Sequence, residues 1–199
     1  MEFVKTADGS KTLYHEEVGE HYHSKHGAHQ ESVHVFLNTG LRYWLEKESS
    51  GSASVLEIGF GTGLNFLMTA DYCHKHQISL NYVGIEAFPL SQELIQHSEY
   101  GQYISEVVWA NFIEKYPKAI DSKTKLLDSM QFEVAHQKVM DFHSEELFDV
   151  IYFDAFAEIH QPEMWTPETL AHVCQFLKPG GVFVTGAPGK REMLRATKL

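Results

Sequence analysis

The residues whose types and spacing most clearly indicate a chemical function form a glycine-rich loop with an acid in front of it. Gly59, Gly61 and Gly63 give the pattern G-F-G-T-G directly after the apolar stretch Val55–Ile58, which contains Glu57. Glycines let the backbone turn tightly and approach a ligand closely. A dinucleotide site usually shows G-x-G-x-x-G and holds a pyrophosphate, which an acidic neighbour would repel. The pattern therefore favours a ligand with a cationic end, such as S-adenosylmethionine; the alternative is a glycine-rich turn that binds nothing.

Three more acids follow predicted strands. Glu86 is placed to accept hydrogen bonds from ribose hydroxyls, unless it is simply a solvated acid at a strand end. Asp141 would face the exocyclic amine of adenine, with Met140 and Phe142 near the ring; the alternative is a surface acid. Asp154 ends the most apolar strand, where it would hold a substrate amine or take its proton, or serve only the structure.

Histidines gather near the N-terminus, where six of the thirteen lie between His15 and His34. The H-Y-H motif at His21 and His23, with more histidines nearby, admits a zinc site. No HExxH motif or cysteine accompanies them, so the preferred interpretation is a polar substrate lid without metal.

The elements that must position these residues alternate between strands and helices. We predict a loop or lid over the first thirty residues, densest at Gly19–Ser32, with a short hairpin before it. The predicted strands are Val55–Ile58, Leu80–Ile85, Phe132–His136, Val150–Phe153 and Val182–Thr185. The predicted helices are Glu31–Lys47, Gly63–His76, Ser91–Ser98, Gly101–Lys125 with a break at Pro117, and Thr166–Leu177.

This order predicts an α/β, Rossmann-like fold with a mostly parallel sheet and helices on both faces. Ligands of such sheets bind at the carboxyl ends of the strands, where the acids above lie. We divide the chain into residues 1–50, a His-rich lid and amphipathic helix, and residues 51–199, the core.

Composition narrows the class of protein. The chain has 199 residues, no apolar run long enough to span a membrane, and no signal-peptide pattern. Cys73 and Cys174 are far apart, which suits core thiols in the reducing cytosol. The net charge of −11 argues against general nucleic-acid binding. The only clustered basic residues are Lys190, Arg191, Arg195 and Lys198.

Several separated motifs resemble one family, the bacterial tRNA 5-methylaminomethyl-2-thiouridine methyltransferases. LNFL after the glycine loop and QPEMW after the aspartate are more specific than the glycines alone. The motifs are EIGFGTGLNFL at Glu57–Leu67, EAFPL at Glu86–Leu90, DAFAEIHQPEMWT at Asp154–Thr166, KREML at Lys190–Leu194 and the block Tyr14–Leu37.

The resemblance implies a cytoplasmic methyltransferase that uses S-adenosylmethionine on the 5-aminomethyl group of the tRNA wobble uridine. Larger relatives carry a second, FAD-dependent domain; no FAD motif is present here, so a separate enzyme would make the aminomethyl precursor. By resemblance, the glycine loop and Glu57 hold the methionine part, Glu86 the ribose, Asp141 the adenine, and Asp154 the substrate amine. The predicted cofactor-binding residues are Glu57, Gly59, Phe60, Gly61, Gly63, Asn65, Glu86, Ala87, Asp141, Phe142 and Asp154.

Two departures from the family pattern matter. Glu158 replaces the proline of D-x-F-A-P, and Thr185 runs directly into Gly186, where family members have a helix and a strand of about thirty residues in total. Either the protein is truncated or the sequence joins two segments across a gap; we favour a gap, since deletion would expose the sheet. Two other functions stay open: methylation of a small amine such as a polyamine, and a His-rich metal-binding module.

Overall fold

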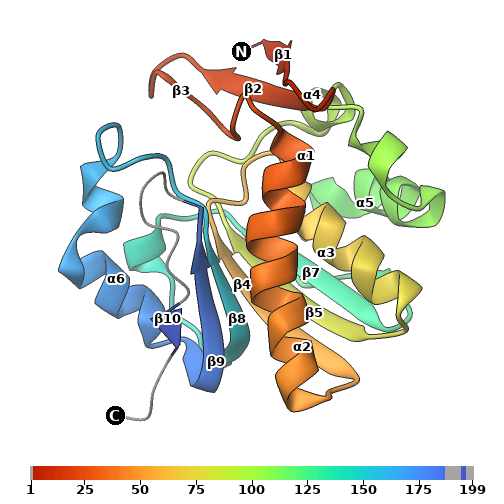
Figure 1. Cartoon of the computed structure of the whole chain (residues 1–199), viewed down its shortest axis with the longest axis vertical. Coiled ribbons are helices and arrows are strands. Elements are labelled where there is room, and N and C mark those ends of the chain that lie inside the picture. Colours follow the sequence, from red (N-terminus) through yellow and green to blue (C-terminus); the bar gives the residue numbers. More distant parts are fainter. Residues whose placement is uncertain (1, 187–193, 196–199) are drawn as a thin grey trace.

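A seven-stranded sheet forms the centre of the computed structural model, which describes residues 2–186 and 194–195 (Figure 1). Its order is β10-β9-β8-β4-β5-β7-β6; the five central strands are parallel, and the edge strands β10 and β6 pair antiparallel. The strands are β4 (Ser52–Ile58), β5 (Ser79–Ile85), β6 (Thr124–Leu127), β7 (Met130–Ala135), β8 (Phe148–Phe153), β9 (Leu177–Thr185) and β10 (Leu194–Arg195). The predicted Rossmann-like, mostly parallel sheet is confirmed.

The central strands are apolar because both faces of the sheet are covered. All six residues of β8 are buried, and so are the last four of β4. In the register, Ile58 pairs with Ile85 on one side and with Phe153 on the other. The residues that follow these three strands therefore emerge together at one edge of the sheet.

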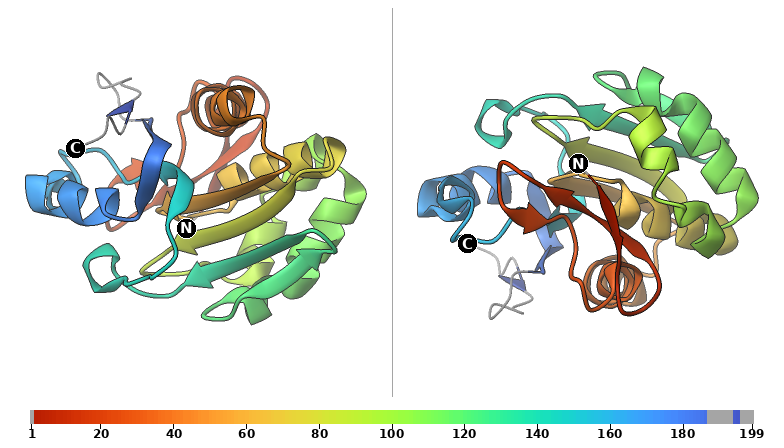
Figure 2. Two further views of the ribbon diagram at one scale, coloured as in Figure 1. Left: turned by 90° about the horizontal axis from the view of Figure 1, so that it is seen from below. Right: turned by 90° about the horizontal axis from the view of Figure 1, so that it is seen from above.

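Helices cover the two faces unequally (Figure 2). One face carries a continuous helix made of α1 (Ala28–Glu31), η1 (Ser32–Arg42) and α2 (Tyr43–Glu48), together with α3 (Leu64–Lys75) and α5 (Glu106–Ala119). The other face carries η3 (Val139–Asp141) and α6 (Pro167–Cys174). The short helices α4 (Gln92–Gln96), η2 (Tyr100–Tyr103) and η4 (Pro162–Trp165) lie in connections.

Two helix predictions need correction. The first helix begins at Ala28 and has π-type bonding over Ser32–Arg42. The predicted break at Pro117 is wrong, since α5 continues to Ala119. A proline leaves the carbonyl four residues earlier without its amide donor. Here that carbonyl, Ile113 O, accepts a hydrogen bond of 2.6 Å from Gln92 Nε2 instead.

The N-terminal segment is a small sheet rather than a loop. Strands β1 (Phe3–Lys5), β2 (Lys11–His15) and β3 (Glu20–His21) pair antiparallel and lie over the carboxyl ends of the large sheet (Figure 1). The predicted hairpin is confirmed; the predicted loop over Gly19–Ser32 is wrong, because it contains β3 and the start of the helix. Asp8 fixes the β1–β2 turn by accepting hydrogen bonds from Thr6 and Ser10.

This N-terminal sheet shares its core with the rest of the protein. Leu13 and Phe36 belong to the same buried cluster as Phe66. Cys73 is buried as predicted, whereas Cys174, at the end of α6, is exposed, so it is not a core thiol. Within the described residues, no helix is both long and apolar enough to cross a membrane.

The predicted gap would lie directly after β9, between Thr185 and Gly186. β10 pairs antiparallel with β9, so Leu194 lies opposite Phe183. KREML and the basic residues Lys190, Arg191 and Lys198 lie outside the described residues, apart from Leu194 in β10. The division at residue 50 and the missing segment after Thr185 stay predictions.

Candidate functional site

The glycine loop takes backbone conformations that side chains rarely adopt. Gly59, Gly61 and Gly63 have φ values of 84°, 52° and 78°. A Cβ on Gly59 would lie 2.5 Å from the carbonyl oxygen of Asp154. The amides of Gly59 and Phe60 both donate to Ile85 O, at 3.0 and 3.1 Å. The loop is therefore pinned between the ends of β5 and β8, with no room for a side chain at its first glycine.

A buried acidic network lies beside this loop. Asn65 Nδ2, in the first turn of α3, donates to Glu57 Oε1 at 2.9 Å and to Asp154 Oδ2 at 2.7 Å. The hydroxyl of Tyr82 donates to the other oxygen of Glu57 at 2.7 Å. The opposite end of the Asn65 amide, Oδ1, is buried without a hydrogen-bond partner. The structure thus joins two of the predicted acids through a third predicted residue.

Both acids are held where a negative charge is costly. Glu57 is 1% exposed. Burial raises its pKa well above the usual range, and nearby Asp154 raises it further, against the hydrogen bonds from Tyr82 and Asn65. The pKa of Asp154 is also raised, first by burial and then by the charge of Glu31. A cationic ligand would relieve this accumulation of buried acid.

Glu86 comes to the same edge of the sheet by a different set of contacts. Its Oε2 accepts from Gly61 N at 2.9 Å and its Oε1 from Phe88 N at 3.0 Å. The residue is half-buried, Ala87 beside it is also half-buried, and the ring of Phe88 is 73% exposed. Glu86 therefore orders the glycine loop and stays open on one side.

Four other residues that the sequence analysis placed near the cofactor lie differently. Asp141 is exposed at the end of η3, and Met140 is 40% exposed. The ring of Phe142 is buried, 5.1 Å from that of Phe176 in the core of the opposite face. The ring of Phe60 packs in the main core. The rings of Phe60 and Phe142 thus pack in the two separate hydrophobic cores of the protein.

Sequence reasoning missed the side chains that cover the loop. A Cβ on Gly61 would lie 2.8 Å from Cδ1 of Tyr22, whose ring packs 5.2 Å from that of Phe156. His23 is buried, and its Nε2 lies 3.1 Å from the hydroxyl of Thr62 in the loop. The H-Y-H motif signalled these residues, but its position over the loop depends on long-range strand pairing. The described residues contain no cluster of three or more metal-ligating side chains.

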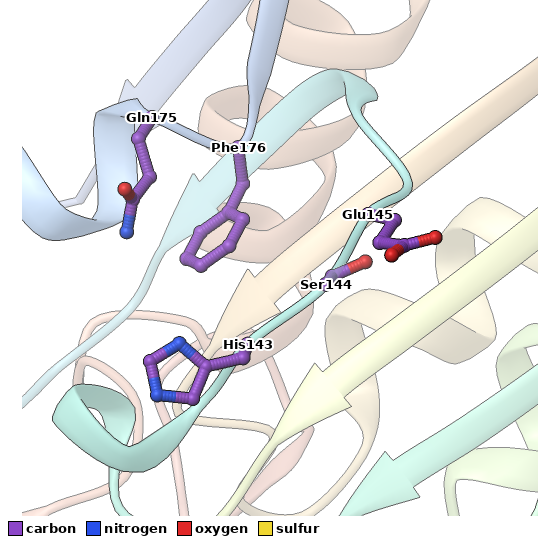
Figure 3. A pocket seen from close by; sticks show the side chains of 5 residues that line it. All are labelled: His143, Ser144, Glu145, Gln175 and Phe176. Atoms are coloured by element: carbon purple, nitrogen blue, oxygen red, sulfur yellow. The ribbon is translucent and has the colours of Figure 1, made fainter.

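Two surface hollows lie away from the acidic network. Figure 3 shows the side chains that line the first hollow, which come from the segments directly after η3 and α6. They are His143, Ser144, Glu145, Gln175 and Phe176. The volume of this hollow is about 350 Å³. A second hollow of about 500 Å³ lies at the amino ends of the strands, near Ser54 and Lys178. Neither hollow is lined by a predicted site residue.

The residues at the loop fit a cofactor with an ammonium group, a sulfonium and a ribose. The glycines expose backbone where a ligand must approach closely. Glu57 and Asp154 supply carboxyl groups, and the described residues place only the neutral ring of His23, and no lysine or arginine, as a basic group against them. Asn65 Oδ1 is a buried acceptor without a partner, so an N–H or O–H group of a ligand can donate to it.

Comparisons with known proteins indicate the class of enzyme. A family model described as S-adenosyl-L-methionine-dependent methyltransferase matches residues 101–188. The tRNA 5-methylaminomethyl-2-thiouridine biosynthesis bifunctional protein MnmC of Idiomarina loihiensis is 31% identical over 179 residues, covering 82% of this chain and 29% of the relative. The protein of the same name from Methylibium petroleiphilum is 30% identical, covering 85% and 27%. The chain therefore spans less than a third of these relatives.

A solved structure agrees on the fold. The crystal structure of MNMC2 from Aquifex aeolicus superposes with a TM-score of 0.70 at 24% identity, covering 92% of this chain and 58% of that one. The fold and the family match together define a Rossmann-like, S-adenosylmethionine-dependent methyltransferase. Over about four fifths of its length the chain is similar to part of the bifunctional MnmC proteins.

Proposed function

We propose that the protein transfers a methyl group from S-adenosylmethionine to the amine of 5-aminomethyl(-2-thio)uridine at the tRNA wobble position. The product is 5-methylaminomethyl(-2-thio)uridine. The observation that carries the proposal is the pair of acids, Glu57 and Asp154, joined through Asn65 beside the glycine loop. The named relatives act in the biosynthesis of this nucleoside, which supports the choice of amine.

We assign each acid to a different part of the cofactor according to its position. Glu57, the more deeply buried, holds the ammonium group of the methionine part, and Asn65 Oδ1 accepts from the same part of the cofactor. Glu86 accepts from the ribose, with Ala87 beside it, and exposed Asp141 accepts from the adenine amine. Gly59, Gly61 and Gly63 supply the close backbone approach. When bound, the cofactor supplies an electrophilic methyl group on a positively charged sulfur.

Asp154 serves the substrate. Its side chain is 18% exposed, so an amine can reach it from outside. A carboxylate there holds the amine nitrogen in line with the methyl group, and such positioning supplies a large part of the rate in a transfer between two bound partners. The proposed activity needs no FAD in this chain, because a separate enzyme would supply the aminomethyl group.

One observation favours a second substrate class. The chain carries −11 net charge, and Glu20 and Glu31 add to the negative field around Asp154. Such a site attracts a free polycation as well as an amine on RNA. The second candidate is therefore a polyamine methyltransferase.

A competition assay separates the two. The purified protein receives labelled S-adenosylmethionine with tRNA carrying 5-aminomethyl-2-thiouridine, with spermidine, or with both. The proposal expects label in tRNA alone, undiminished by micromolar spermidine. Label in spermidine with none in tRNA would establish the second candidate instead.

A further inference from the structure

The orientation of the buried His23 ring can be worked out from a chain of hydrogen bonds. The hydroxyl of Tyr100 donates to the carbonyl oxygen of Lys11 at 3.0 Å. Its oxygen must then accept from Thr62 Oγ1, 3.2 Å away, because each hydroxyl has one hydrogen. With its hydrogen used, Thr62 accepts from His23 Nε2 at 3.1 Å. The proton of a neutral His23 is therefore on Nε2, and Nδ1 carries a free lone pair.

That lone pair faces an acid. His23 Nδ1 lies 4.0 Å from Asp154 Oδ2, and the two side chains are 7% and 18% exposed. A neutral Nδ1 and an ionised carboxylate are both acceptors, so only an N–H or O–H donor between them satisfies the pair. Asp154 is the outer member, which an incoming ammonium group meets first. His23 lies behind it.

Burial and charge act on the proton affinity of His23 in opposite directions. Burial lowers the pKa of His23 to about 4, so the imidazole is neutral in the free protein. An ammonium group held against Asp154 lowers the raised pKa of that carboxyl and keeps it ionised, and the ionised carboxylate in turn favours a proton on Nδ1 of His23. The groups that face it are Thr62 of the glycine loop and Asp154 at the end of β8. Glu20 and Glu31 add negative charge around Asp154. An imidazolium formed at Nδ1 would thus lie next to a carboxylate in an acidic surrounding, which stabilises it.

We infer that His23 takes up, at Nδ1, the proton that the substrate amine must lose, while Asp154 holds that amine beside it. This rests on the proposed function for the identity of the amine. The amine arrives as R–CH2–NH3⁺, and one N–H bond breaks as its proton passes to Nδ1. The neutral nitrogen then forms a bond to the methyl carbon as the carbon–sulfur bond breaks, giving R–CH2–NH2⁺–CH3 and the thioether. The imidazolium returns its proton to solvent.

Kinetics test the inference with His23→Gln, which keeps an acceptor and a donor but takes up no proton. We expect kcat at pH 7 to fall about 100-fold to 10,000-fold, the range for loss of a general base. Because solvent must then take the proton, the deficit should shrink at least about tenfold between pH 7 and pH 9. His26→Gln, an exposed histidine three residues away, is the matched control and should keep wild-type kcat. A kcat within threefold of wild type, or a deficit independent of pH, would overturn the inference.

A second measurement does not depend on turnover. Nitrogen-15 NMR of the histidine rings, with the His23 signal assigned from its loss in His23→Gln, reports which nitrogen carries the proton. We expect the Nε2–H form at pH 7, and a shift of Nδ1 towards its protonated value when a primary-amine substrate binds. An Nδ1–H form in the free protein would overturn the inference. If the wild-type protein shows the Nε2–H form but does not methylate the proposed tRNA, the proposed substrate is wrong. If another primary amine then produces the expected Nδ1 shift, the role of His23 as proton acceptor stands.

Discussion

Replacing Glu57 by glutamine should weaken cofactor binding and stabilise the free protein at the same time. The carboxylate is 1% exposed and receives two hydrogen bonds, from Asn65 at 2.9 Å and from Tyr82 at 2.7 Å. Glutamine preserves the shape; its oxygen can accept from Asn65, and its amide can donate to the Tyr82 hydroxyl, which can rotate. The change therefore removes a buried charge and little else.

The loss of affinity follows from the ligand charge left behind. Removing one member of a buried, hydrogen-bonded charge pair costs about 2–4 kcal/mol, which corresponds to a Kd about 30-fold to 1,000-fold higher. Both S-adenosylmethionine and S-adenosylhomocysteine carry the ammonium group, so both should weaken to a similar degree. Isothermal titration with the two ligands measures this directly.

The stability of the free protein should change in the opposite direction. Burial raises the pKa of Glu57 above its unfolded value, so folding takes up a proton and stability falls as pH rises above that unfolded value. Glu57→Gln removes this penalty and should raise Tm at pH 8 more than at pH 5. Each 1 kcal/mol regained corresponds to about 2–4 °C at this chain length.

Glu114→Gln, at an exposed position of α5, is the control for both measurements and should change neither. If Glu57→Gln bound S-adenosylhomocysteine as tightly as wild type, Glu57 would not face the ammonium group. If it lowered Tm equally at both pH values, the account of a costly buried charge would be wrong.

Three more changes follow from the same structure. Asp154→Asn should lower kcat about 100-fold or more with the Kd for S-adenosylhomocysteine within a few-fold, measured by steady-state kinetics and titration; full activity would remove its role. Gly59→Ala, at φ 84° with its Cβ 2.5 Å from Asp154 O, should cost about 1–3 kcal/mol in urea unfolding, and an unchanged midpoint would contradict the tight approach. Asp8→Ala removes the acceptor for Gln30 N at the first helix and should cost about 1 kcal/mol. Burial raises the pKa of Asp8, but hydrogen bonds from Ser10 and Thr6 outweigh it and hold it at about 2, so this difference should be full above pH 4 and vanish as pH falls through 2; a constant difference would refute it.

The parts of the fold that depend on local pattern could be predicted from the sequence. The parallel strands read as short apolar runs because both faces are buried, and β8 is the clearest example. The positions of Glu86 and Asp154 follow, since a residue after a parallel strand must emerge at one edge of the sheet. Glu57, the last residue but one of β4, lies next to that edge. Asn65 is the asparagine of the LNFL motif, but its hydrogen bonds to Glu57 and Asp154 could be identified only from the structure.

The parts that depend on distant contacts could not be predicted. Pro117 stays inside α5 because Gln92, 25 residues earlier, satisfies the freed carbonyl of Ile113. The N-terminal strands are short and polar, so only their pairing shows that Tyr22 and His23 lie on the glycine loop. Phe60 lies between two glycines of the loop, so nothing in the local sequence shows that its ring packs in the core.

The central claim is most directly tested on the nucleoside itself. Purified protein is incubated with S-adenosylmethionine bearing a deuterated methyl group and tRNA carrying 5-aminomethyl-2-thiouridine, and the tRNA is then digested for mass spectrometry. The account predicts that the aminomethyl nucleoside disappears and that 5-methylaminomethyl-2-thiouridine with the deuterated methyl on its amine nitrogen replaces it. An unchanged aminomethyl nucleoside, from a protein that binds S-adenosylhomocysteine, would contradict the account.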